Sequence, residues 1–118
     1  MSLSYAECQE LTKRSRQGRK KLRNNVYLQK MLDGSFAVQM YQTDIVTIHQ
    51  DGTVTLNNGG WYTVTTKANI NKYAPCYVHQ IKGEWYVSDT NQATKSDMVP
   101  YVNGMVICPT KLHKLLVA

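Results

Sequence analysis

The sequence predicts an α+β fold, a twisted antiparallel β-meander packed with an N-terminal helix and one short internal helix. Two observations carry this prediction: helix-start signals near residues 4 and 65, and repeated runs of period-two hydrophobicity after residue 24. The 118 residues are 42% hydrophobic, which suits one core rather than two. We expect a basic N-terminal helical segment over residues 1–23, a β-rich core domain over 24–108 and a peripheral tail over 109–118.

The first predicted element is a helix from about Tyr5 to Gln17. Ser4 and Glu7 have the spacing of a capping box, in which each side chain binds the other residue's backbone amide. Gly18 is placed to end the helix, because glycine adopts the left-handed conformation of a helix C-terminus at little cost.

The next elements are four strands joined by tight turns. Asp33-Gly34 and Asp51-Gly52 each lie between two alternating runs, and Asp-Gly favours the type I′ turn of a hairpin, in which both central residues have positive φ. The predicted strands cover residues 26–31, 35–41, 44–49 and 53–56.

The remaining chain predicts a helix, two hairpins and a loop. The helix covers residues 63–73, with Thr65 as N-cap, Ile70 and Tyr73 as core anchors, and Ala74-Pro75 as the stop. The hairpins turn at Lys82-Gly83 and Asn103-Gly104, and the polar residues 88–97 between them predict a mobile loop.

The net charge of +6 is concentrated near the N-terminus. Residues 1–23 hold two acidic residues, Glu7 and Glu10, and half of the fourteen basic ones. Such a cluster suits nucleic-acid phosphates or an acidic partner protein, and the alternative is a solvated helix end that keeps the protein soluble. The candidate binding residues are Lys13, Arg14, Arg16, Arg19, Lys20, Lys21 and Arg23.

A second candidate site follows the break at residues 57–60. Two glycines permit close approach, two aromatic side chains offer stacking faces, and a helix start offers free amides to an anion or ligand. In the alternative interpretation the glycines only reverse the chain, Trp61 fills the core and Thr65 only caps the helix. The residues of this site are Gly59, Gly60, Trp61, Tyr62, Thr65, Thr66 and Lys67.

Catalytic and metal sites are not expected. Cys76 and His79 point to opposite faces if they share a strand, so they cannot join Cys108 and His113 at a zinc ion. The carboxylates Asp51 and Glu84 are explained by their turns. We therefore expect no enzyme activity, no cofactor, and reduced thiols at Cys8, Cys76 and Cys108.

The chain shows no secretory signal at its first residues and no apolar run long enough to cross a membrane. These absences lead us to expect a cytoplasmic protein without a membrane partner.

Residues 24–108 contain a specific series of short motifs: Asp51-Gly52-Thr53, then Gly59-Gly60-Trp61, then Thr63-Val64-Thr65-Thr66-Lys67. Over about this range the sequence resembles a family of small, largely uncharacterised accessory proteins of tailed bacteriophages. The resemblance implies a phage product acting in the host cytoplasm, and it implies no activity.

Two functions are consistent with these residues, and a minor virion component is a third. The first is host takeover or anti-defence, through non-enzymatic binding to a host protein or complex. The alternative is a nucleic-acid or nucleotide binder that uses the basic segment and the Gly-Gly-Trp turn. In the pairs Trp61-Tyr62 and Trp85-Tyr86 we expect one ring of each pair to be exposed, which favours a binding surface. Association of several copies is left open.

Overall fold

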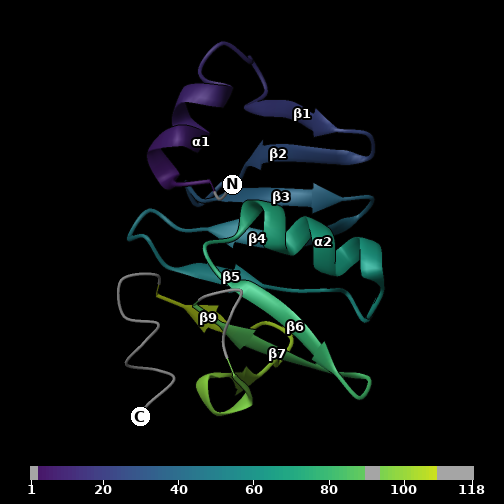
Figure 1. The fold of residues 1–118 in the computed structure, drawn as a ribbon. Coiled ribbons are helices and arrows are strands. Elements are labelled where there is room, and N and C mark those ends of the chain that lie inside the picture. The colour runs from purple at the N-terminus through teal and green to yellow at the C-terminus, as the bar shows by residue number, and fades with distance from the viewer. Residues whose placement is uncertain (1–2, 90–93, 109–118) are drawn as a thin grey trace.

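The computed structural model describes residues 3–89 and 94–108. Two α-helices, nine strands and one short 3₁₀ helix are found in these residues (Figure 1). In chain order they are α1 (Tyr5–Thr12), β1 (Arg19–Arg23), β2 (Val26–Lys30), β3 (Phe36–Met40), β4 (Thr43–Ile48), β5 (Val54–Leu56), α2 (Val64–Tyr73), β6 (Tyr77–Ile81), β7 (Glu84–Ser88), η1 (Lys95–Asp97), β8 (Val99–Pro100) and β9 (Val106–Ile107). The predicted α+β class, with an N-terminal and an internal helix, is confirmed.

The strands form two antiparallel sheets rather than the single sheet we expected. The larger has the order β1-β2-β3-β4-β5-β9, and the smaller has the order β6-β7-β8. Strands β2 to β5 are the four predicted from sequence, and they follow one another in the sheet as a meander. Figure 1 shows α2 lying in front of β4, and the smaller sheet below the larger one.

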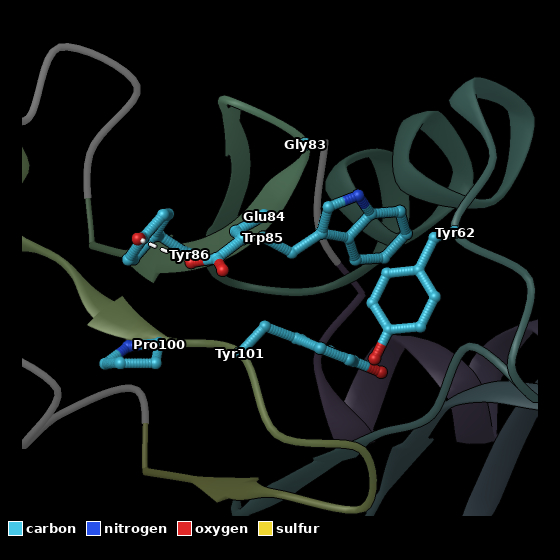
Figure 2. Close-up of a pocket in the computed structure, with 7 residues that line it drawn as sticks. All are labelled: Tyr62, Gly83, Glu84, Trp85, Tyr86, Pro100 and Tyr101. Atoms are coloured by element: carbon cyan, nitrogen blue, oxygen red, sulfur yellow. Dashed lines mark hydrogen bonds between the residues drawn. The ribbon is translucent and has the colours of Figure 1, made fainter.

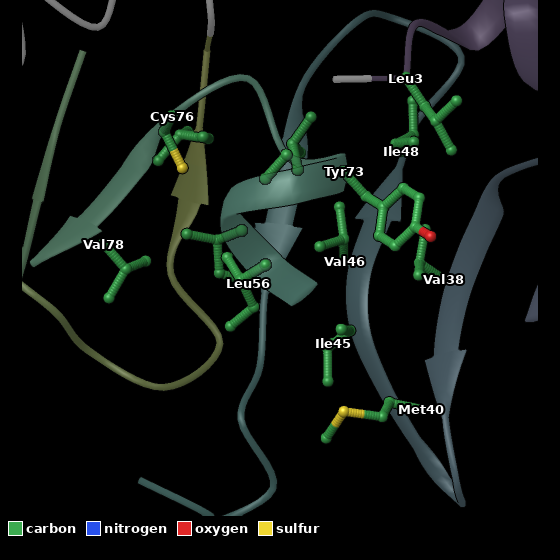
Figure 3. Close-up of a cluster of buried hydrophobic side chains, with 14 of the residues drawn as sticks. Leu3, Val38, Met40, Ile45, Val46, Ile48, Leu56, Tyr73, Cys76 and Val78 are labelled. Carbon is green, nitrogen blue, oxygen red and sulfur yellow. The ribbon is translucent and has the colours of Figure 1, made fainter. Parts of the chain in front are cut away.

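One face of the larger sheet forms the core, and the cross-strand pairs on that face are buried. Leu28, Val38, Val46 and Leu56 are opposite one another across four strands and are all fully buried. Both helices contribute to the same core, with Cys8 from α1 and Ile70 and Tyr73 from α2. Figure 3 shows Tyr73 pointing from α2 toward the strand residues of this cluster. The opposite face carries polar, half-exposed side chains such as Gln29, Gln39 and Thr47.

The N-terminal helix is shorter than predicted. Its capping box at Ser4 and Glu7 is present, but α1 ends at Thr12 rather than Gln17. The helix stops there because the following residues are used in the sheet: Arg19–Arg23 forms the edge strand β1, and Leu22 packs against the core. Gly18 therefore does not end the helix but directly precedes β1, and its carbonyl accepts a hydrogen bond from the Lys30 amide of β2 at 2.7 Å.

The two Asp-Gly turns form, but not as type I′ turns. Only the glycines have positive φ, at 90° for Gly34 and 91° for Gly52. Asp33 Oδ1 instead accepts from the amide and hydroxyl of Ser35 at 2.9 and 2.6 Å, and Asp51 makes the same bonds to Thr53. These bonds lower the pKa of both carboxyls. In each turn the aspartate keeps a negative φ, and its side chain stabilises the turn by accepting hydrogen bonds from the residue two positions later. The predicted type I′ geometry is therefore wrong for these two turns.

The turn between β6 and β7 is as predicted. Lys82 and Gly83 both have positive φ, at 52° and 83°, which is the pattern of a type I′ turn.

The internal helix was placed correctly, with one error in its cap. Ile70 and Tyr73 are buried and Ala74 ends the helix, as expected. The N-cap is Thr63 rather than Thr65, because the Thr63 hydroxyl accepts from the Thr66 amide at 3.2 Å. Thr65 lies inside the helix and is exposed.

The final predicted hairpin is divided between the two sheets. Val99–Pro100 pairs with β7, whereas Val106–Ile107 pairs with β5, so the turn at Asn103-Gly104 joins one sheet to the other. The predicted loop over residues 88–97 lies partly outside the described residues, and its described end forms η1. The predicted tail over 109–118 lies outside them entirely.

Candidate binding surfaces

An open groove lies beside the N-terminus of α2. It has a volume of about 930 Å³, and its most exposed aromatic walls are Tyr41, 68% exposed, and Trp61, 63% exposed. Tyr41 lies in the β3–β4 turn with a φ of 56°, which is uncommon for a residue with a Cβ atom. The lining residues are Met40, Tyr41, Gln42, Thr43, Trp61, Thr63, Thr65 and Thr66.

The turn before α2 holds Trp61 outside the core. Gly59 has a φ of 64°, and a Cβ atom there would lie 2.8 Å from the Thr43 hydroxyl oxygen, so only glycine fits. The Asn58 side chain accepts from the Gly60 amide at 2.9 Å, and the Asn58 carbonyl accepts from the Trp61 amide at 2.9 Å. The interpretation in which Trp61 fills the core is therefore wrong, because this turn directs its ring toward solvent.

The predicted anion site at the helix start is only partly available. The Thr66 amide is already bound by the Thr63 hydroxyl, and Thr66 itself is fully buried. Thr65 is exposed on the groove wall, and Lys67 is half-buried on the next turn of α2. Of the seven residues predicted for this site, Trp61, Thr65 and Thr66 line the groove, while Tyr62 faces a different pocket.

The seven predicted basic residues are all exposed, but they do not form one face. Lys13, Arg14 and Arg16 lie between α1 and β1, and Lys13 forms an ion pair with Glu10 at 2.9 Å. On β1 the register alternates, so Lys20 is opposite Leu28 on the core side, whereas Arg19 and Lys21 share the open face with Tyr27. The Arg19 guanidinium lies 4.1 Å from the centre of the Tyr27 ring, at cation–π distance.

One side chain connects the basic strand to the groove. Arg23 lies at the end of β1, and its Nη1 donates to Asn69 Oδ1 on α2 at 3.4 Å. The Asn69 amide nitrogen in turn donates to the Thr65 carbonyl at 3.1 Å and lies 3.2 Å from Met40 Sδ. Two sites that are separate in the sequence therefore meet at Asn69, a residue that carries no sequence signal of its own.

A second, smaller pocket of about 380 Å³ lies on the β6–β8 sheet (Figure 2). Trp85 is buried and contacts Tyr62 and Tyr101 edge to face, with ring centres 4.9 and 5.3 Å apart. Burial raises the pKa of Tyr101 to about 12. The pocket is lined by Tyr62, Gly83, Glu84, Trp85, Tyr86, Pro100 and Tyr101.

The chain matches the family model of the Kyanoviridae Gp96 protein over residues 6–108. It belongs to this family. The match confirms that this is a phage protein, as the resemblance implied. No curated protein and no solved structure matched the chain.

Two of the three thiols of this Gp96-family protein are shielded. Burial raises the pKa of Cys8 and of Cys76 to about 12, and the Glu7 carboxylate adds to the effect at Cys8. Cys108 is half-buried. Such pKa values keep Cys8 and Cys76 protonated and unreactive at neutral pH.

Within residues 3–89 and 94–108, no three histidine, cysteine or acidic side chains are grouped as metal ligands. His79 Nε2 lies 2.6 Å from the Ser88 hydroxyl across the β6–β7 pair. His113, part of the zinc set considered from sequence, lies outside the described residues. No helix in the described ranges is both long and apolar enough to span a membrane.

Proposed function

We propose that this Gp96-family protein is a non-enzymatic accessory protein that acts in the host cytoplasm by binding a host protein, in host takeover or in countering host defence. The observation that carries the proposal is the groove between Tyr41 and Trp61. Both rings are more than three-fifths exposed, and the adjoining Val64 is 75% exposed.

This surface has the composition of a protein-binding site. Tyrosine and tryptophan dominate the few residues that supply most of the energy of protein interfaces. They lie beside helix α2, whose buried anchors fix its position on the sheet, so the groove is held by a rigid part of the fold. The threonine hydroxyls around the rings add hydrogen-bonding groups at the rim, as interfaces commonly have.

The proposal is tested by recovering bound proteins from host cells that express tagged protein. Three forms are compared: wild type, Trp61→Ala and the control Leu32→Ala. Leu32 is a fully exposed apolar residue that does not line the groove, so its replacement controls for lost surface hydrophobicity. We expect one host protein with wild type and Leu32→Ala that is lost with Trp61→Ala. Equal recovery with all three forms would contradict the proposal.

The second candidate function is nucleic-acid or nucleotide binding, and the Arg23–Asn69 contact favours it. That contact links a guanidinium through Asn69 to Thr65 on the groove wall, and the groove has exposed aromatic rings on which a base could stack. The remaining cations extend along β1 and the segment before it.

A salt titration on duplex and single-stranded probes separates this candidate from the first. If Lys21 and Arg23 contact phosphates, replacing both by alanine should flatten the log–log salt dependence by roughly two. Affinity no better than about 10⁻⁴ M near physiological salt would exclude nucleic-acid binding, since ordinary non-specific binders reach that value.

A further inference from the structure

The pocket on the β6–β8 sheet joins aromatic rings to one carboxylate. Glu84 and Tyr86 lie on the same face of β7, and Pro100 is opposite Tyr86 on β8. Figure 2 shows the Glu84 carboxylate beside Tyr86, with a dashed line between them, while the indole of Trp85 extends in the opposite direction toward Tyr62. The indole nitrogen of Trp85 lies on the side of its ring away from Tyr101, so the wall that Trp85 presents there is carbon.

The pocket exists because β8 leaves β7 early. Beyond the Tyr86–Pro100 pair, one further bond joins the strands, from the Tyr101 amide to the Trp85 carbonyl at 3.0 Å. Tyr101 then turns inward against Trp85 and Tyr62, while Gly83 and Glu84 extend past the end of β8. The opening at this sheet edge is therefore lined by the half-exposed ring of Tyr62, the buried rings of Trp85 and Tyr101, and the β6–β7 turn.

The charge of the pocket is negative although the protein is basic. Glu84 accepts a hydrogen bond from the Tyr86 hydroxyl at 3.1 Å, and among the side chains that the structure describes it forms no ion pair with a lysine or arginine. This bond and the carboxylate's charge raise the pKa of Tyr86. The carboxylate therefore remains available for a positive charge from a ligand.

We propose that this pocket binds the cationic head of a ligand, an alkylated ammonium or a guanidinium group. Aromatic faces attract such cations through their quadrupoles, and an uncompensated carboxylate adds a direct charge pair. A neutral group of the same shape would gain the apolar contacts alone. The inference is independent of the proposed function, because the pocket and the Tyr41–Trp61 groove share no lining residue.

The test follows backbone amide signals of isotope-labelled protein during titration with choline and with its neutral isostere 3,3-dimethylbutan-1-ol. Choline should move the signals of Glu84, Trp85 and Tyr101, and it should bind at least about tenfold more tightly than the alcohol. Short glycine-serine peptides bearing one trimethyllysine or one arginine form the second arm. Tighter binding of a peptide indicates a protein side chain as the natural ligand, and tighter binding of choline indicates a small molecule.

Two variants complete the test. Glu84→Gln keeps the shape of the side chain and removes its charge, so choline affinity should fall, while the cation–π attraction of the remaining rings keeps it above that of the alcohol. Asp89→Asn removes an exposed carboxylate that does not line the pocket, and it should leave the affinity unchanged. Tyr62→Ala removes the half-exposed ring from the pocket wall and should also weaken choline binding. It replaces Glu84→Gln as the test if that variant does not fold. Any of three results would overturn the proposal. They are equal affinity for choline and the alcohol, unmoved amide signals of Glu84, Trp85 and Tyr101 on addition of choline, and wild-type choline affinity in Glu84→Gln.

Discussion

The sequence contains the dipeptide Trp-Tyr twice, and the structure treats the two copies in opposite ways. Trp85 is 3% exposed and anchors the smaller sheet, whereas Trp61 is 63% exposed. Trp85 lies on β7, which is paired on both sides, so strand alternation directs one ring of the pair into the core. Trp61 follows a glycine turn and precedes a helix, and no neighbouring strand decides its direction.

The difference indicates which aromatic residues the fold needs. A ring buried between elements is explained by stability, but a large exposed ring held by a specific turn contributes little to folding. Tyr41 belongs with Trp61 in this respect, since it is 68% exposed and lies across the same groove. Contiguous exposed aromatics of this kind mark interaction sites.

Replacing each tryptophan with alanine tests most directly whether the two differ in their contribution to stability. Trp85→Ala should lower the free energy of unfolding by about 3–5 kcal/mol, because it leaves a cavity among Tyr62, Tyr101 and the sheet. Trp61→Ala should change it by no more than about 0.5 kcal/mol, as surface replacements do. Chemical denaturation measures both values, and equal losses would show that Trp61 also supports the core.

A second replacement tests the larger sheet in the same way. Ile48 is 2% exposed and is opposite Phe36 and Val54 on the buried face. Ile48→Ala should cost about 2–5 kcal/mol through lost burial and the cavity left behind. Thr47, the half-exposed neighbour of Ile48 on the other face of β4, provides the control, since Thr47→Ala should cost much less. A melting temperature unchanged by Ile48→Ala would mean that the two faces are reversed.

Alkaline pH should weaken the buried core before it affects the exposed groove. The Cys76 thiol has its pKa raised by burial from 9.0 to about 12, so the unfolded chain loses this proton at lower pH than the folded chain does. The contribution of this thiol to the free energy of unfolding should therefore be constant below pH 9 and fall as pH rises from 9 toward 12, by up to about 1.4 kcal/mol per pH unit. Denaturation curves of wild type and Cys76→Ala at several pH values measure the slope. An identical slope in the variant would remove Cys76 as its cause.

The cap of α2 gives a smaller effect at the base of the groove. Thr63→Ala removes the hydroxyl that accepts from the Thr66 amide and should cost about 1 kcal/mol. Thr65→Ala, two residues later on the exposed surface, should be close to neutral. Thermal unfolding of the pair decides between the cap predicted from sequence and the cap in the structure, and a larger loss with Thr65→Ala would favour the former.

Local patterns predicted much of this fold. The capping box at Ser4 and the alternating runs from residue 26 to 56 depend on neighbouring residues, and each produced the expected helix start or strand. The basic strand β1 was missed because Arg19–Arg23 has only one apolar side chain, Leu22, so no alternation of hydrophobicity is visible. Its pairing with β2 is a tertiary contact that overrides that local signal.

The sites were less predictable than the fold, because they depend on distant contacts. Trp61 was identified from the turn that precedes it. Tyr41, which lines the same groove, lies in the β3–β4 turn about twenty residues earlier, and no local pattern links the two residues. Asn69 appears in the sequence as an ordinary helix residue, and only the structure shows it between Arg23 and Thr65. Similarly, Glu84 was interpreted only as part of a hairpin, since its aromatic surroundings come from Tyr62 and Tyr101.

The central claim is that the exposed ring of Trp61 serves binding rather than folding. The decisive measurement is the dissociation constant of the purified protein with the host protein recovered from cells, for wild type and for Trp61→Ala. We predict that Trp61→Ala weakens binding by at least about thirtyfold, equivalent to about 2 kcal/mol at an interface hot spot, while its free energy of unfolding stays within about 0.5 kcal/mol of wild type. An unchanged dissociation constant for Trp61→Ala would contradict the account.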